Sequence, residues 1–252
     1  MKEKLYTIPL NDAVNANDEC PFCFMERKLE HDLMDFVLGS GASYMESDIR
    51  AETDKSGFCR AHFKKMFDFG NTLGNAWILK TRYQETLKEM KTKMQGQSFV
   101  KMSIFDKKKA GIGRNNPIGK WTLERKYSCY ICNRFESEYP RYMDTFLYLY
   151  EKDPSFKNKI LNSKGFCLTH FGDLCEHAQT HLNKKQIDEF FPPLFSLMEN
   201  NMTRLYDDVS WLIEKFDYEN KDADWKNSKD ALQRGMQKLK GGYPADPVYK
   251  KR

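Results

Sequence analysis

Two groups of cysteine and histidine in this chain have the residue types and the spacing of a metal-binding site. The first group starts with a CxxC pair, Cys20 and Cys23. After 35 intervening residues it continues with Cys59 and His62, which lie in the phrase GFCRAHF (57–63). The pair supplies two sulfur atoms, and the phrase supplies one sulfur atom and one imidazole.

The second group repeats this pattern further along the chain. Cys129 and Cys132 form its CxxC pair, and after 34 intervening residues GFCLTHF (165–171) provides Cys167 and His170. Six of the seven cysteines and two of the five histidines therefore belong to one repeated pattern.

Three thiolates and one imidazole are a complete tetrahedral shell for zinc, whose structural sites are closed by four protein ligands. Cys and His three residues apart point the same way when the phrase begins a helix. A closed shell leaves no position for a reactive water, which disfavours a zinc hydrolase. We therefore predict two structural Cys3His zinc ions, with the ligands Cys20, Cys23, Cys59, His62, Cys129, Cys132, Cys167 and His170.

The same pattern leaves other interpretations open. Iron–sulfur clusters also take thiolate ligands, and the cysteines could instead be buried apolar residues left by a duplication. Ligands could also be exchanged between the two modules, although self-contained sites are the simpler expectation. A thioredoxin-like role for either CxxC is disfavoured because no strand precedes the motif.

Each phrase begins with glycine and phenylalanine. Gly57 and Gly165 permit a sharp turn into the predicted helix, and the free amides at the helix N-terminus favour thiolate charge. We expect Phe58 and Phe166 to pack beneath the sites.

The repeat extends beyond the ligands. LMDFVL (33–38) aligns with YMDTFL (142–147), so Asp35 and Asp144 each lie twelve residues after the second cysteine of their pair. Their carboxylates could accept the remaining ring N–H of the two histidines. The favoured interpretation is a carboxylate on the surface of a helix.

The other residues that could bind a metal or react are better explained by ordinary structural roles. Glu26 and Glu136 follow the CxxC pairs and are expected to be helix-face acids. Cys175 is expected to be a small buried apolar residue. His177 and His181 have the four-residue spacing that can chelate a metal on one helix face, but the sequence offers no third ligand, so a surface pair is favoured.

The apolar pattern predicts an all-α fold, a duplicated helical metal-binding module plus a C-terminal helical region. Helices are predicted over 26–38, 62–90, 136–150, 170–182 and 187–218, the last interrupted early by Pro192 and Pro193. The predicted organisation is a first CxxC…GFCxxH module at 1–95, a basic Gly- and Lys-rich linker or loop at 96–126, a second module with C-terminal helices at 127–240, and a flexible tail at 241–252.

The net charge and the hydropathy of the chain limit the kinds of partner that it is expected to bind. The net charge of +5 falls short of the dense basic face of a dedicated nucleic-acid binder. No signal peptide and no run of about eighteen apolar residues is found, so we expect a cytoplasmic protein with no membrane partner and no disulfide framework. Nucleic acid could bind the linker through Lys107, Lys108, Lys109, Arg114, Lys120, Arg125 and Lys126, with Phe105 and Trp121 stacking on bases, but a soluble loop explains these residues equally well.

The paired CxxC and GFCxxH motifs, together with EKFDYEN and KDALQRGMQKLKG within 214–241, resemble a bacterial family catalogued as a domain of unknown function, the one numbered 6062. The resemblance covers nearly the whole chain and implies a cytoplasmic bacterial protein with two similar halves. It carries no established activity.

The favoured function is a zinc-binding helical scaffold that binds or regulates a protein partner. A thiol redox or zinc-release switch is an alternative, as is an enzyme with a cleft between the modules. No nucleophile, base and orienting group can be named together, so we assign no catalytic residue and rank catalysis last.

Overall fold

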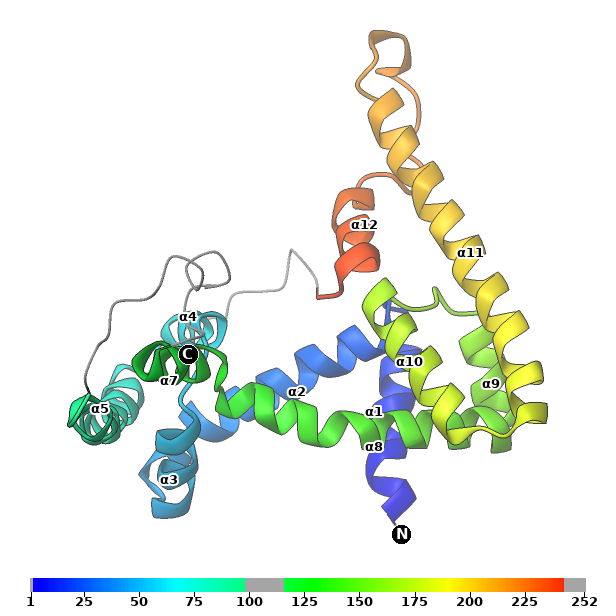
Figure 1. Ribbon diagram of the computed structural model, residues 1–252. Coiled ribbons are helices and arrows are strands. Elements are labelled where there is room, and N and C mark those ends of the chain that lie inside the picture. The colour runs from blue at the N-terminus through cyan, green and yellow to red at the C-terminus, as the bar shows by residue number, and fades with distance from the viewer. Residues whose placement is uncertain (1, 98–115, 243–252) are drawn as a thin grey trace, which may run out of the picture. The chain divides into compact units, whose positions relative to one another are not determined.

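The computed structural model describes residues 2–97 and 116–242, and over these residues the all-α prediction is confirmed (Figure 1). Within the same residues, no helix is both long and apolar enough to cross a membrane. The helices are α1 (Lys2–Asn15), α2 (Pro21–Leu38), α3 (Ser47–Ser56), α4 (Arg60–Phe69), α5 (Thr72–Met94), α7 (Pro117–Tyr127), α8 (Tyr130–Lys152), α9 (Pro154–Leu161), α10 (Leu168–His181), α11 (Lys184–Glu214) and α12 (Ala231–Lys240), with short 3-10 turns η1 (Ser43–Met45) and η2 (Tyr218–Asn220).

The chain forms two compact units that do not follow the order of the sequence modules. The described part of unit 1 lies within Met1–Leu29 and Glu138–Pro247, and that of unit 2 lies within Glu30–Ser137. Both boundaries fall inside helices, so the chain passes from unit 1 to unit 2 along α2 and returns along α8. Each CxxC pair therefore shares a unit with the GFCxxH phrase of the other module.

Unit 1 is built around an aromatic core. Phe22 of α2, Phe146 of α8 and Phe166 of the second phrase are almost completely buried. The ring centroid of Phe22 lies 5.4 Å from that of Phe146 and 5.7 Å from that of Phe166. Because these rings come from three separate segments, their burial holds the start of α2 against the second phrase.

Unit 2 has a smaller core of the same plan. Phe58 of the first phrase is buried and packs edge-on against Tyr130 at the start of α8, with ring centroids 6.2 Å apart. Met34, which the repeat aligns with Met143, is fully buried here, whereas Met143 is buried in the core of unit 1. The aligned methionines thus serve two separate cores.

The glycines of the two phrases have the backbone that the sequence predicts. Gly57 has φ +66° and Gly165 has φ +72°. Residues other than glycine rarely adopt this backbone conformation. Cys59 and Cys167 follow two residues later as the N-cap residues of α4 and α10. The sharp turn therefore delivers each cysteine to the start of a helix.

The predicted linker is helical where the structure describes it. Residues 98–115 lie outside the described residues, but α7 occupies Pro117–Tyr127, so the expectation of a loop is wrong there. The Asn116 side chain caps α7 by accepting hydrogen bonds from the amides of Ile118 and Gly119. Pro117 fits the first helical position, where an amide is not needed. This cap explains the helix in a segment rich in Gly and Lys.

Two further boundaries differ from the sequence prediction. α11 runs unbroken through Pro192 and Pro193, since the residues whose carbonyls lose a partner, Asp188 and Glu189, are exposed to solvent. The helix after the first phrase instead ends at Gly70, which has φ +86°, and restarts as α5. The tail that the sequence predicts to be flexible is packed at its first residue, because Gly241 lies against Cys23 and Cys167.

We predict opposite effects of alanine at two nearby glycines. Gly165→Ala should destabilise the fold by about 1–2 kcal/mol, because the left-handed conformation penalises a side chain and the new Cβ would lie 3.1 Å from Met198 Sδ. Gly172→Ala, inside α10 with open space around it, should stabilise by about 0.5–1 kcal/mol. Denaturant unfolding of both variants measures the difference. Equal effects of the two substitutions would contradict this account.

Candidate metal centres

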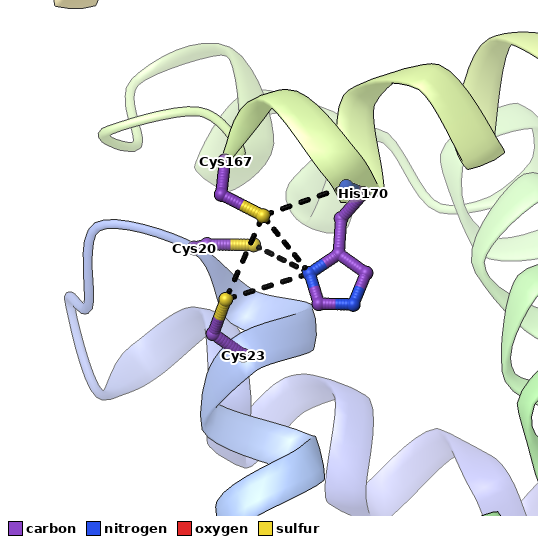
Figure 2. Close-up of side chains that lie close together, drawn as sticks. All are labelled: Cys20, Cys23, Cys167 and His170. Atoms are coloured by element: carbon purple, nitrogen blue, oxygen red, sulfur yellow. Dashed lines mark hydrogen bonds between the residues drawn. The ribbon is translucent and has the colours of Figure 1, made fainter. Parts of the chain in front are cut away.

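The structure brings the eight predicted ligands together in two groups of four. The first cluster contains Cys20, Cys23, Cys167 and His170, all in unit 1 (Figure 2). His170 Nδ1 lies 3.4 Å from Sγ of both Cys20 and Cys23 and 3.2 Å from Sγ of Cys167. The Sγ atoms of Cys23 and Cys167 are 3.7 Å apart. One nitrogen thus faces three sulfur atoms.

The second cluster has the same arrangement in unit 2. It contains Cys59, His62, Cys129 and Cys132. His62 Nδ1 lies 3.2 Å from Sγ of Cys59, 3.1 Å from Sγ of Cys129 and 3.5 Å from Sγ of Cys132. In both clusters the donor that faces the sulfurs is Nδ1, which leaves Nε2 free to bond elsewhere.

These separations can be compared with a tetrahedral zinc shell. Zn–S bonds of about 2.3 Å and Zn–N bonds of about 2.0–2.1 Å require sulfur–sulfur edges of about 3.8 Å and sulfur–nitrogen edges of about 3.6 Å. The sulfur–sulfur distance of 3.7 Å meets the first value, and the nitrogen–sulfur distances approach the second. The residues therefore fit one tetrahedral ion of this size in each cluster.

The expectation of self-contained sites is wrong. Each cluster takes its CxxC pair from one module and its Cys and His from the other. The reason lies in α2 and α8, whose N-terminal ends lie in a different unit from the rest of the helix. Because both modules carry the same donor types, the sequence spacing could not distinguish the exchanged grouping from the self-contained one.

Helix starts position the sulfur atoms. The CxxC pairs open α2 and α8, and Cys167 at the N-cap of α10 accepts a hydrogen bond from the amide of His170 at 3.4 Å. This contact is the amide support expected for a thiolate. In the second cluster the amide of Tyr130 donates to the carbonyl oxygen of Gly57 at 2.8 Å and ties the phrase directly to the CxxC turn.

Carboxylates of α2 contact the outer nitrogen of both histidines. His62 Nε2 lies 2.8 Å from Glu30 Oε1, and His170 Nε2 lies 3.4 Å from Glu26 Oε1. Such a partner fixes the tautomer in which Nδ1 is free to bind a metal. The view of Glu26 as an ordinary helix-face acid is wrong, and Glu30 was missed.

The aligned aspartates do not fill this role. Asp144 contacts His177 Nε2 at 2.8 Å instead, and Asp35 lies beside Gly39 at the end of α2. The signal that could have found the glutamates is their four-residue spacing, which places Glu26 and Glu30 on one face of α2. Glu136, by contrast, is exposed on α8.

The support around the two histidines differs at aligned positions. Tyr139 stands 109 residues after Glu30, the same offset as between Cys20 and Cys129. The Tyr139 ring lies 5.7 Å from the His170 ring, and its hydroxyl donates to Asp173 at 3.1 Å.

Glu30 is likewise paired with a residue of the helix that carries its histidine. It forms a salt bridge with Lys65, which aligns with Asp173 of the second module. The aligned positions thus hold a Glu–Lys pair in one module and a Tyr–Asp pair in the other.

A family model described as "Family of unknown function (DUF6062)" matches residues 1–246. The chain belongs to this family. The match confirms the resemblance that the paired motifs and the segment within 214–241 indicate. No curated protein and no solved structure matches the chain.

Protons occupy the second cluster when no cation is bound. Burial opposes a charge on His62, but hydrogen bonds with Cys129 and Glu30 outweigh it and raise the pKa of His62 to about 10. Burial also opposes ionisation of Cys129, yet the hydrogen bond with His62 lowers its pKa to about 6. Burial and the neighbouring Cys129 raise the pKa of Cys132 above its ordinary range. A metal ion must therefore displace protons to bind.

The first cluster shows the same division of charge. Hydrogen bonds with Cys20 and Cys23 lower the pKa of Cys167, and the bond to Cys167 raises the pKa of Cys23. Burial opposes a charge on His170, but its hydrogen bonds with Cys167 and Cys20 raise its pKa to about 12. Three sulfur atoms this close cannot all carry a negative charge without a cation.

The clusters differ in their exposure. All four residues of the first cluster are buried, and Gly241, the residue directly after α12, lies against it. A Cβ on Gly241 would stand 3.5 Å from Cys167 Sγ and 3.7 Å from Cys23 Sγ. In the second cluster Cys59 and Cys132 are only partly buried. Solvent therefore reaches the sulfur atoms of the second cluster more readily.

A buried lysine fixes α12 beside the first cluster. Lys238 is 1 % exposed, and its ammonium donates to the carbonyl oxygens of Glu19 and Lys164 at 2.6 and 2.5 Å. It also forms a salt bridge of 3.2 Å with the Glu19 carboxylate. Glu19 precedes Cys20, and Lys164 precedes the second phrase, so one side chain joins the two segments that supply the ligands. No pattern in the sequence indicates this role.

Among the remaining candidate residues, Cys175 is partly buried against the core of unit 1, and burial raises the pKa of its thiol. Trp121 is buried, and its indole donates to Glu89 at 2.9 Å, so its ring is not free to stack on bases. Arg125 is paired with Glu89 at 3.2 Å. Phe105, Lys107, Lys108, Lys109 and Arg114 lie outside the described residues.

We predict that Glu30→Gln weakens zinc binding at the second cluster alone. Loss of the carboxylate charge behind His62 should reduce affinity by about tenfold or more. Competition against a chromophoric chelator should resolve one weakened ion and one unchanged ion.

Glu136→Gln is the matched control, since Glu136 is exposed and should change neither affinity. Equal weakening of both ions by Glu30→Gln, or of neither, would contradict the assignment of Glu30 to His62.

Proposed function

We propose that the protein is a zinc-stabilised helical scaffold that binds a protein partner, with one structural zinc ion in each cluster. The observation that carries this proposal is the convergence of three sulfurs and one imidazole nitrogen at tetrahedral spacing in both clusters. Four protein ligands close the shell, so the ion would organise the fold and leave no position for a substrate.

The spacing favours zinc over an iron–sulfur cluster. Cys3His is a common structural zinc shell, and donor atoms 3.1–3.7 Å apart surround the volume of a single ion. An iron–sulfur cluster places several iron and sulfide atoms between its protein ligands and needs a wider separation.

Each ion would join helix starts that lie far apart in the chain. In unit 1 it would connect α2 to α10, and in unit 2 it would connect α8 to α4. Binding energy of this kind is folding energy, since an unfolded chain does not preform the site. The zinc ions would therefore hold both modules in the exchanged arrangement.

A binding role is supported by α12, an amphipathic helix whose polar face is buried and whose apolar face is exposed. Its polar residues Arg234, Gln237 and Lys238 are buried. The opposite face is apolar and exposed to solvent, at Leu232 (54 %), Met236 (47 %) and Leu239 (51 %). A soluble helix normally buries its apolar face, so this stripe indicates a surface that a partner covers.

The spacing of the stripe indicates the kind of partner. Leu232, Met236 and Leu239 stand at i, i+4 and i+7, the pattern that meets the apolar face of another helix. The buried ion pairs of Arg234 with Asp208 and of Lys238 with Glu19 hold the stripe outward. We therefore assign an amphipathic helix of a protein partner to this face.

Metal analysis tests the zinc assignment. Purified protein should contain about two zinc ions per chain, and removing them with a strong chelator should reduce the helical circular dichroism signal. Protein without metal that keeps its helices and has seven freely reactive thiols would overturn the proposal.

Charge substitution on α12 tests the binding face. Leu232→Lys and Met236→Lys should leave the free energy of unfolding within about 0.5 kcal/mol of the parent, because both side chains already lie in solvent. The same variants should lose a partner that the parent chain retains. Lys229→Ala, an exposed change outside the apolar stripe, is the control and should retain it. A large loss of stability in the two lysine variants would show that the stripe packs within the fold.

The exposure of the second cluster favours one further function, a zinc-release switch driven by thiol oxidation. Under limiting peroxide, the partly buried thiols of Cys59 and Cys132 should oxidise and release one zinc ion before the first cluster reacts. Zinc release followed with a fluorescent indicator, together with mass mapping of the oxidised cysteines, measures the order. Simultaneous loss of both ions, or a fully inert protein, would exclude the switch.

A further inference from the structure

A third cluster of metal-binding side chains lies apart from the two cysteine clusters. It consists of Asp144 on α8 and of His177 and His181 on α10. The ligand atoms of the three residues lie within 4.8 Å of one another. The sequence shows only the histidine pair, and folding supplies the carboxylate as a third ligand.

The two histidines lie side by side on one face of α10. Without an ion their rings are stacked, with centroids 3.9 Å apart and an angle of 26° between the planes. Binding one ion requires the rings to turn until both Nε2 lone pairs point at it. His181 Nδ1 donates to the carbonyl oxygen of His177 at 2.9 Å, which leaves Nε2 of His181 with a free lone pair. A backbone carbonyl in this position is the usual support of a metal-bound histidine.

The carboxylate faces the same two nitrogens. Asp144 Oδ1 lies 2.8 Å from Nε2 of His177 and 3.9 Å from Nε2 of His181. Ligands bonded to one ion at about 2.0–2.2 Å stand about 3 Å apart at adjacent octahedral positions. The first distance meets this value, but without an ion it is a hydrogen bond in which His177 Nε2–H donates to the carboxylate, so a bound ion would replace that proton. The second distance would shorten to this value if the side chains rotated slightly. They have room to do so because Asp144 and His181 are half-exposed.

We propose that Asp144, His177 and His181 form an exchangeable site for a first-row divalent transition ion such as zinc. Two imidazoles and one carboxylate suit such ions and leave the outward coordination positions to water. The site lies about 10 Å along α10 from His170 of the first cluster, seven residues at 1.5 Å each. It differs from the cysteine clusters in being open, and its ion exchanges with solution.

Calorimetric zinc titration of the full chain tests this site. The protein is first loaded with zinc at the cysteine clusters and dialysed, so that only weaker binding is measured. A further equivalent of zinc should then bind. His181→Ala and Asp144→Asn should each weaken that step by at least about tenfold, the lower end of what even an indirect supporting group contributes at a metal site.

His31→Ala is the matched control, because it removes an exposed histidine outside the cluster. It should leave the additional equivalent unchanged, and circular dichroism should show the same helix content in every variant. Absence of the additional equivalent overturns the proposal. Unchanged binding by Asp144→Asn also overturns it, since the site would then be a histidine pair alone.

Discussion

The fold depends on one constraint, the convergence of three sulfur atoms on a single imidazole nitrogen in each unit. Every segment that supplies a donor is the start of a helix, so the position of the donors fixes the directions of α2, α4, α8 and α10. Without a cation these atoms hold protons, as the raised pKa values of His62 and Cys132 indicate. A dication of zinc's size would replace those protons and make the same contacts favourable.

The repeat explains why the clusters are alike, and the exchange of ligands explains how they join the chain. Because α2 and α8 each begin in one unit and end in the other, each cluster combines halves of two modules. The surroundings of the two clusters differ, whereas their cysteine and histidine residues are equivalent. The outer nitrogen of His62 contacts Glu30, which pairs with Lys65, and that of His170 contacts Glu26. At the positions aligned with Glu30 and Lys65, Tyr139 packs its ring against His170 and donates to Asp173. The covering of α12 and Gly241 over the first cluster has no counterpart among the described residues of unit 2.

Much of this could be predicted from the sequence, and the failures have physical causes. Donor types and local helix starts are encoded over short distances, so the eight residues that form the clusters and the turns at Gly57 and Gly165 could be predicted. The grouping of the ligands depends on long-range packing, and identical donor sets leave no trace of it in the spacing. Lys238, buried among backbone carbonyls, reads in the sequence as an ordinary surface residue, and Asp144 gains its histidine partners only through packing of α8 against α10.

The exchanged grouping is tested most directly by counting zinc in two double variants with native mass spectrometry. Cys20 and Cys167 lie in one cluster, whereas Cys20 and Cys59 lie in different clusters. Cys20→Ser with Cys167→Ser should therefore retain about one zinc ion, and Cys20→Ser with Cys59→Ser should retain none. The opposite result, with one ion kept by the second pair and none by the first, would show that the sites are self-contained and would contradict this account.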